Sequence, residues 1–194
     1  MNEHEQHRVH SIPNNVFVYG TLMADDVLLS LLGRVPPSVP ALLRDFTRYA
    51  VQGCPYPGIV HERGGLVVGK VGRSFLLPPP PHHPRLAYPL FALLSDAAVQ
   101  VFADLSDREK AIFDEFEDGA YRKVVVLVEM QDGRQEQDRW QQACVYIYPE
   151  RAPADGPPLS NHPWDYEGFK DMNLEGYVKM CHLFMSELGA KGYS

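Results

Sequence analysis

The fold is decided by V-F-V-Y-G-T-L at residues 16–22 and by F-D-E-F-E-D-G-A-Y-R at residues 113–122. The first stretch is a short apolar run, typical of a buried strand, that stops at Gly20. The second places Glu117 at the apolar end of an expected helix, directly before another strand. A backbone turn able to hold an anion, together with one carboxylate among apolar side chains, indicates acid–base chemistry on a small charged substrate without a metal.

Strands dominate the middle of the chain and do not alternate with helices. The pattern predicts strands over residues 16–19, 42–52, 65–71, 121–130 and 140–148, and a rigid loop over 54–60. It predicts helices over residues 25–32, 95–103 and 106–117, and one long helix from Asp165 onward. Ser106 followed by Glu109 is a capping box, and Asp165 is an expected N-cap. This order favours an α+β domain around a small, partly closed, mixed β-barrel flanked by helices over a doubly wound sheet.

We expect a disordered tail over residues 1–13 and one domain over residues 14–189, with a proline-rich insertion at about residues 75–89. Six prolines in that insertion exclude a helix or a central strand there, so it is an exposed loop or, alternatively, a docking segment for partner domains. A second proline-rich stretch, residues 149–163, is the expected linker to the last helix. That helix carries an apolar stripe that predicts core packing: Phe169, Met172, Tyr177, Cys181, Phe184 and Leu188.

Composition narrows the classes of function. The 194 residues are 45% hydrophobic and 22% charged, with a net charge of -7 and no concentration of Lys and Arg, which excludes nucleic acid and anionic membranes as partners. Cys54, Cys144 and Cys181 are odd in number and form no C-x-x-C pair, which indicates reduced thiols without zinc. Because neither a signal peptide nor a membrane-spanning apolar run is present, we expect a cytoplasmic protein.

The turn formed by Tyr19, Gly20, Thr21 and Leu22 is the expected anion site. A strand that ends in glycine exposes successive backbone N–H groups, and a helix starting near Ala24 adds the positive end of its dipole. Gly20 permits a close approach that a side chain would block. The same residues also fit a plain turn between a strand and a helix, and the residues alone leave both interpretations open.

Glu117 is the candidate general acid and base. A carboxyl group held among Phe and Tyr side chains has its ionised form disfavoured, which raises its pKa. Glu115 lies roughly 200° around the expected helix and faces elsewhere, whereas Asp114 shares the face of Glu117. The alternative is a solvated Glu at a frayed helix end.

Taken together, these segments resemble the gamma-glutamylcyclotransferase family. The motifs are V-Y-G-T-L at residues 18–22, Y-P-G at 56–58, and D-x-x-E at 114–117 followed by Y-R at 121–122. W-D-Y-E-G-F at residues 164–169 resembles the plant avirulence-induced-gene branch of that family. The resemblance runs from about residue 14 to residue 188, interrupted by the proline-rich insertion.

The resemblance implies a gamma-glutamylcyclotransferase-like barrel with one cavity beside the end of the first strand. It implies an acyltransferase without metal or cofactor, in which the α-amine of a γ-glutamyl amine or small γ-glutamyl peptide attacks the γ-carbonyl, forming 5-oxoproline and releasing the amine or amino acid. In this chain it assigns the acid–base role to Glu117. It assigns substrate binding to Tyr19, Gly20, Thr21, Leu22, Tyr56 and Tyr121.

Two departures from the family pattern keep a second hypothesis open. Asp118 stands between Glu117 and Gly119, and Lys123 occupies the place where Arg is expected. A non-catalytic small-molecule binder with the same fold is therefore the alternative function. The leaving amine and the oligomeric state are not predicted.

Overall fold

The computed structural model describes residues 13–71, 101–102, 105–117, 119–131, 133, 135–149 and 156–190. Its elements are β1 (Val16–Phe17), η1 (Thr21–Met23), α1 (Asp25–Leu32), β2 (Ser38–Val51), β3 (Pro57–Val71), β4 (Val101–Phe102), α2 (Asp107–Glu117), β5 (Arg122–Met130), η2 (Glu136–Asp138), β6 (Trp140–Ile147), β7 (Leu159–Pro163), α3 (Tyr166–Met172) and α4 (Leu174–Ala190). The expected tail, apart from Pro13, and the expected insertion at residues 75–89 lie outside the described residues. Among the helices described, none is long and apolar enough to cross a membrane.

The strands form one 7-stranded sheet that curls into a half-barrel. The order is β3-β2-β4-β1-β6-β5, and β7 pairs with β2. Strand β5 returns to β2, where Ala41 lies opposite Met130 and Leu42 opposite Glu129. Strand β1 runs antiparallel to β4 and parallel to β6, so the sheet is mixed. These pairings confirm the predicted α+β domain with a small, partly closed, mixed barrel.

The first strand separates two apolar cores. Because successive side chains of a strand point to opposite faces, Phe17 and Tyr19 enter the barrel interior while Val16 and Val18 pack toward the helices. The Phe17 ring is fully buried and occupies the space left by Gly69, because a Cβ at position 69 would lie 2.1 Å from it. The alternation therefore fixes which way the chain leaves β1, and this places the turn at Gly20 at the barrel end.

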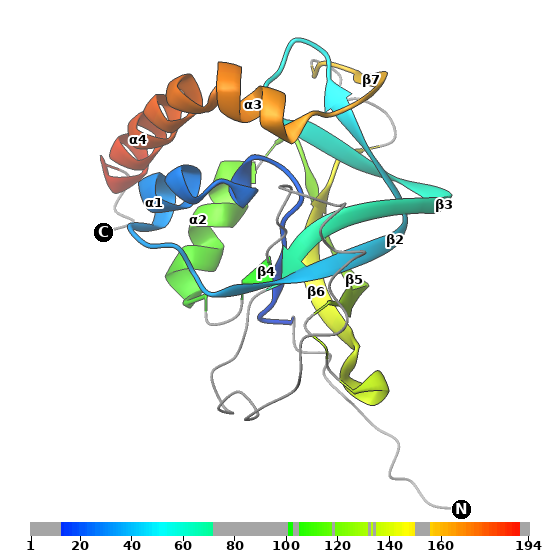
Figure 1. Ribbon diagram of the computed structural model, residues 1–194. Coiled ribbons are helices and arrows are strands. Elements are labelled where there is room, and N and C mark those ends of the chain that lie inside the picture. Colours follow the sequence, from blue (N-terminus) through cyan, green and yellow to red (C-terminus); the bar gives the residue numbers. More distant parts are fainter. Residues whose placement is uncertain are drawn as a thin grey trace, which may run out of the picture.

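The helices cover one side of the curled sheet, with α3 and α4 crossing above α1 and α2 (Figure 1). The predicted capping box is confirmed at the start of α2, where Ser106 N donates to Glu109 Oε2 at 2.8 Å and Glu109 N donates to Ser106 Oγ at 3.2 Å. Arg34, just after α1, also binds the Glu109 carboxylate at 2.6 and 2.8 Å. These bonds fix α2 against α1 and so set where its last residue, Glu117, lies.

Several predicted boundaries are wrong in the first half of the chain. The expected loop over residues 54–60 is shorter, and the strand expected over 65–71 is longer, because β3 already begins at Pro57. The strand expected over residues 42–52 begins earlier, at Ser38. Proline is tolerated as the first residue of a strand, and Gly58 packs so closely on Tyr148 that a Cβ would meet its Cβ at 2.6 Å. The predicted strand over residues 16–19 is paired as β1 only over Val16–Phe17.

Other differences concern the second half. The expected helix over residues 95–103 is wrong at Val101–Phe102, which form β4 because they bridge β1 and β2. The expected linker over residues 149–163 contains β7, which pairs with β2. The expected single last helix is two helices, α3 and α4, because Asn173 leaves helical geometry with φ -122 and ψ -20. The predicted N-cap Asp165 is confirmed, since its side chain accepts from Glu167 N at 3.1 Å.

Candidate active site

A cavity of about 230 Å³ lies where the end of β1 meets α2 and α4. Its walls come from the β1–η1 turn, the start of β3, the end of α2 with the following turn, β6 and α4. The lining residues are Phe17, Val18, Tyr19, Gly20, Thr21, Leu22, Tyr56, Pro57, Phe116, Glu117, Ala120, Tyr121, Tyr146, Tyr177, Met180 and Phe184. The structure thus brings every sequence-predicted site residue into one cavity: Tyr19, Gly20, Thr21, Leu22, Tyr56, Glu117 and Tyr121.

The β1–η1 turn, residues 19–22, is the buried floor of the cavity. Met23 N donates to Gly20 O at 2.9 Å, which closes the turn, while the N–H groups of Thr21 and Leu22 have no hydrogen-bond acceptor among the residues that the structure describes. Gly20 is required sterically, because a Cβ there would lie 2.8 Å from the Pro57 ring. Two unengaged N–H groups at a buried turn form an arrangement that suits a carboxylate.

Arg48 of β2 supports this turn from behind. Its Nη1 donates to the Tyr19 carbonyl at 2.6 Å, and its guanidinium lies 5.2 Å from the centroid of the Trp164 ring. Burial lowers the pKa of Arg48, while the charges of Tyr19 and Asp165 act in the opposite direction. Trp164 is itself fixed by its Nε1, which donates to the Pro55 carbonyl at 2.9 Å. Sequence reasoning missed Arg48, since nothing near it in the chain connects it to the turn.

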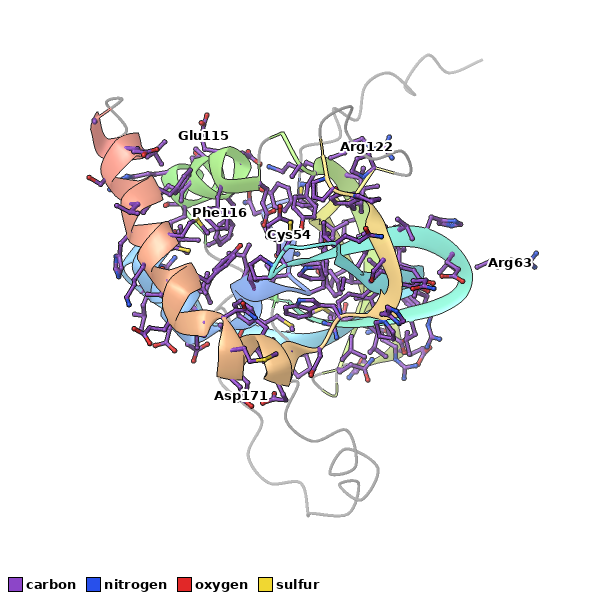
Figure 2. All side chains as sticks on the ribbon, turned by 90° about the horizontal axis from the view of Figure 1, so that it is seen from above. Cys54, Arg63, Glu115, Phe116, Arg122 and Asp171 are labelled. Carbon is purple, nitrogen blue, oxygen red and sulfur yellow. The ribbon has the colours of Figure 1, made fainter. Side chains whose placement is uncertain are left out.

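Glu117 is the last residue of α2; the residue is half-buried and lies in the cavity wall. Burial raises the pKa of Glu117 from the usual 4.5 to about 8. Among the lining residues there is no Lys or Arg that would counter this effect. Figure 2 shows Glu115 on the outer side of α2 and Phe116 on the inner side, as the helical period predicts. A carboxyl group with a pKa near neutrality both accepts and donates a proton at working pH.

Tyrosine hydroxyls fix the walls around the carboxyl group. Tyr121 donates to the Pro57 carbonyl at 2.6 Å, and Tyr19 donates to a backbone carbonyl of β6 at 2.7 Å. Thr21 Oγ1 donates to the Tyr177 hydroxyl at 3.1 Å, so the Tyr177 proton stays available. Burial raises the pKa of Tyr121 and of Tyr177, and the Glu117 charge acts in the same direction. These hydroxyls therefore stay protonated at neutral pH.

Nine lining residues were not predicted as site residues: Phe17, Val18, Pro57, Phe116, Ala120, Tyr146, Tyr177, Met180 and Phe184. Tyr177 and Phe184 belong to the apolar stripe that was predicted to pack in the core. Both side chains pack against the core between the helices, and both also line the cavity. The prediction of core packing is wrong at Met172 of the same stripe, because this residue is 80% exposed. The break at Asn173 turns α3 relative to α4, so one continuous helical period does not hold.

Of the two residues that depart from the family pattern, Lys123 and Asp118, the structure describes only Lys123. Lys123 Nζ binds both Asp114 oxygens, at 2.7 and 2.9 Å, and does not line the cavity. Asp114 also accepts from the Tyr146 hydroxyl at 2.7 Å. Asp118 lies outside the described residues. The Lys123 side chain therefore lies outside the cavity lining, with its Nζ 5.8 Å from the centroid of the Tyr146 ring, which does line the cavity.

Comparison with known proteins finds relatives that cover most of the chain. Residues 16–74 match the family model "Gamma-glutamyl cyclotransferase, AIG2-like", a segment that holds the Tyr19–Leu22 turn and Tyr56 but ends before Glu117. "AIG2-like protein D" of Arabidopsis thaliana is 33% identical over 175 residues, covering 90% of this chain and 91% of the relative. Two solution structures from Arabidopsis thaliana are also similar. One has a TM-score of 0.53 at 23% identity, covering 92% of this chain and 93% of its own. The other has a TM-score of 0.51 at 26% identity, covering 92% and 83%.

Proposed function

Because this chain belongs to the AIG2-like gamma-glutamyl cyclotransferase family, we propose that it cyclises the γ-glutamyl moiety of an amide or small peptide to 5-oxoproline. The single observation that carries the proposal is the position of Glu117. A carboxyl group whose pKa is raised to about 8 shares one small cavity with a buried turn that carries unengaged N–H groups. In this proposal the Tyr19–Leu22 turn binds the α-carboxylate, while Tyr56 and Tyr121 bind the chain of the substrate.

The reaction needs only one side chain for proton transfer. Ionised Glu117 takes a proton from the α-ammonium, and the resulting amine attacks the γ-carbonyl carbon. The ring C–N bond forms as the bond to the leaving nitrogen breaks, and Glu117 returns its proton to that nitrogen. The ring nitrogen still carries one proton more than the lactam needs, and Glu117, ionised again, passes this second proton to the released amine, which leaves as an ammonium ion. No co-reactant is consumed. A positioned acid and base contributes about 10²–10⁴-fold, and folding the glutamyl chain into reach of its own carbonyl adds the advantage of an intramolecular reaction.

The competing function is a non-catalytic binder that uses the same cavity. It was motivated by Lys123 and Asp118, and the Lys123 side chain pairs with Asp114 outside the cavity. The cavity also holds a carboxyl group with a raised pKa that simple binding of a γ-glutamyl compound does not require. We therefore rank the cyclotransferase first.

The test is product analysis with a panel of γ-glutamyl amides and dipeptides. The proposal predicts 5-oxoproline and free amine in equal amounts from at least one substrate, with loss of both in Glu117→Gln. Glu115→Gln, which removes the same charge from the outer side of α2, is the matched control and keeps the wild-type rate. Tight binding of a γ-glutamyl compound without 5-oxoproline would establish the binder instead.

A further inference from the structure

The floor of the cavity offers hydrogen-bond donors but no basic side chain. Glu117 is the only Asp, Glu, Lys, Arg or His that lines the cavity in the described part of the chain. The buried turn offers the N–H groups of Thr21 and Leu22 to a carboxylate. The two oxygens of a carboxylate accept about four hydrogen bonds, and burying the charge is costly unless they are supplied. Two N–H groups therefore leave a substrate carboxylate in need of a further donor.

Tyrosine hydroxyls are the most numerous side-chain donors of the cavity lining, and three of their protons are engaged in the protein. Tyr19 donates to the carbonyl of Tyr146 at 2.7 Å, and the Tyr146 hydroxyl donates to Asp114 at 2.7 Å. Tyr121 donates to the carbonyl of Pro57 at 2.6 Å. A substrate that used any of these protons would have to break a bond that fixes the cavity wall.

The two remaining tyrosines of the lining, Tyr56 and Tyr177, differ in how their hydroxyls are used. Burial and a hydrogen bond with Cys54 raise the pKa of Tyr56, so that hydroxyl also has a partner. The Tyr177 hydroxyl instead accepts a hydrogen bond from Thr21 Oγ1 at 3.1 Å. The Tyr177 proton itself has no acceptor among the described residues, although Tyr177 is only 8% exposed. A buried proton without a partner is uncommon in a folded protein and indicates a ligand.

The Tyr177 hydroxyl lies at the turn that holds the unengaged N–H groups, because its partner Thr21 contributes one of them. The ring is held edge to face by Phe116 and Phe169, at centroid distances of 6.3 and 5.5 Å. Figure 2 shows Phe116 on the side of α2 that faces α4, the helix that carries Tyr177. Burial raises the pKa of Tyr177, so the hydroxyl keeps its proton at neutral pH. The bond that it accepts from Thr21 makes it a stronger donor.

We propose that Tyr177 of α4 is a substrate-binding residue whose hydroxyl donates a third hydrogen bond to the α-carboxylate at the Tyr19–Leu22 turn. This inference rests on the proposed function. The anion site is then shared between two segments whose contact spans 156 positions of chain, and α4 takes a direct part in recognising the glutamyl moiety. The competing role for the same proton is a hydrogen bond to the γ-carbonyl oxygen, where negative charge develops during ring closure.

The first test is the kinetics of Tyr177→Phe, which removes the hydroxyl and keeps the ring. KM for a γ-glutamyl amide should rise at least about tenfold while kcat stays within severalfold of wild type, because a bond to the carboxylate is equally strong before and during ring closure. Tyr166→Phe is the matched control, since it removes a phenol hydroxyl from α3 outside the cavity lining and should change neither constant. A loss that lies in kcat instead would overturn the inference, because it would place the hydroxyl on the reacting carbonyl.

The second test asks whether the carboxylate is the group that Tyr177 binds. 5-Oxoproline and 2-pyrrolidinone are the same lactam with and without the carboxylate, and the affinity of each is measured by calorimetry or by competition. 5-Oxoproline should bind at least about tenfold more weakly to Tyr177→Phe than to wild type, while 2-pyrrolidinone binds equally to both. An equal loss of affinity for the two lactams, or no loss for 5-oxoproline, would overturn the inference.

Failure of the inference is distinguishable from failure of the proposed function. If wild type and Tyr177→Phe form 5-oxoproline with the same kcat and KM, the cyclotransferase stands and the assignment of Tyr177 is wrong. If wild type forms no 5-oxoproline, the cyclotransferase is wrong, and the binding of the two lactams decides the role of Tyr177. A selective loss of affinity for 5-oxoproline in Tyr177→Phe then supports a carboxylate donor in a binding protein. Any other pattern, including no binding by wild type, overturns it.

Discussion

Glu117→Gln should change the pH dependence of stability in a way that can be calculated from the site. The folded-state pKa of Glu117 is raised by burial to about 8 from 4.5, the value expected in the unfolded chain. Below pH 4.5 the group is protonated in both states and has no effect. Between these values the folded state holds more protons than the unfolded state, so stability falls as pH rises, and the loss is complete above about pH 8.

The magnitude follows from roughly 1.36 kcal/mol per pH unit. Wild type should lose about 3 kcal/mol from this group by pH 7 and about 5 kcal/mol in all by pH 9. The Gln side chain does not titrate, so Glu117→Gln should match wild type at pH 4 and exceed its stability by these amounts at pH 7 and pH 9. Urea unfolding of both proteins from pH 4 to pH 9, with Glu115→Gln as the control, measures this difference. A difference between wild type and Glu117→Gln that stays constant over that range would refute the reasoning.

Further predictions concern the support of the site. Arg48→Met leaves the Tyr19 carbonyl without its hydrogen-bond donor. The free energy of unfolding should fall by about 1–3 kcal/mol, and kcat/KM should fall at least tenfold. Unfolding and rate measurements that match wild type would exclude this supporting role of Arg48. Gly20→Ala places a Cβ 2.8 Å from the Pro57 ring, and the turn should shift to relieve this contact. We expect activity to fall at least tenfold while circular dichroism shows a folded protein. Full activity would show that the turn tolerates a side chain. For wild type, kcat/KM should rise with pH to a plateau above about pH 8, because the ionised form of Glu117 is the base. The ammonium group of the substrate is titrated separately as a control. A flat profile of kcat/KM from pH 6 to pH 9 would then contradict the assignment of Glu117 as the base.

Local patterns predicted the parts of the fold that depend on neighbouring residues. The capping box at Ser106 and the N-cap at Asp165 were predicted because each depends on residues two or three positions away. Strand β4 was missed because its two residues are held by pairing with β1 and β2, both distant in the chain. Strand β7 was missed for the same reason, since its pairing with β2 is set by the barrel.

Some residues of the candidate site could likewise be predicted from short segments, and others depend on contacts between distant parts of the chain. The Tyr19–Leu22 turn and Glu117 were predicted because glycine at a strand end and a carboxylate among aromatic residues are visible in short segments. Arg48 was missed, since its contact with Tyr19 spans 29 positions of chain. The aromatic wall from α4 was taken for core alone, because helical periodicity identifies a buried face without showing whether it meets a helix or a cavity.

The most direct test of the central claim is the rate of 5-oxoproline formation from a saturating γ-glutamyl amide by wild type and by Glu117→Gln, with binding of the amide to each measured by calorimetry. If Glu117 is the proton-transfer group, kcat of Glu117→Gln should be about 10²–10⁴-fold lower than that of wild type, while its affinity for the amide stays within severalfold of the wild-type value. Formation of 5-oxoproline by Glu117→Gln at the wild-type rate would contradict the account.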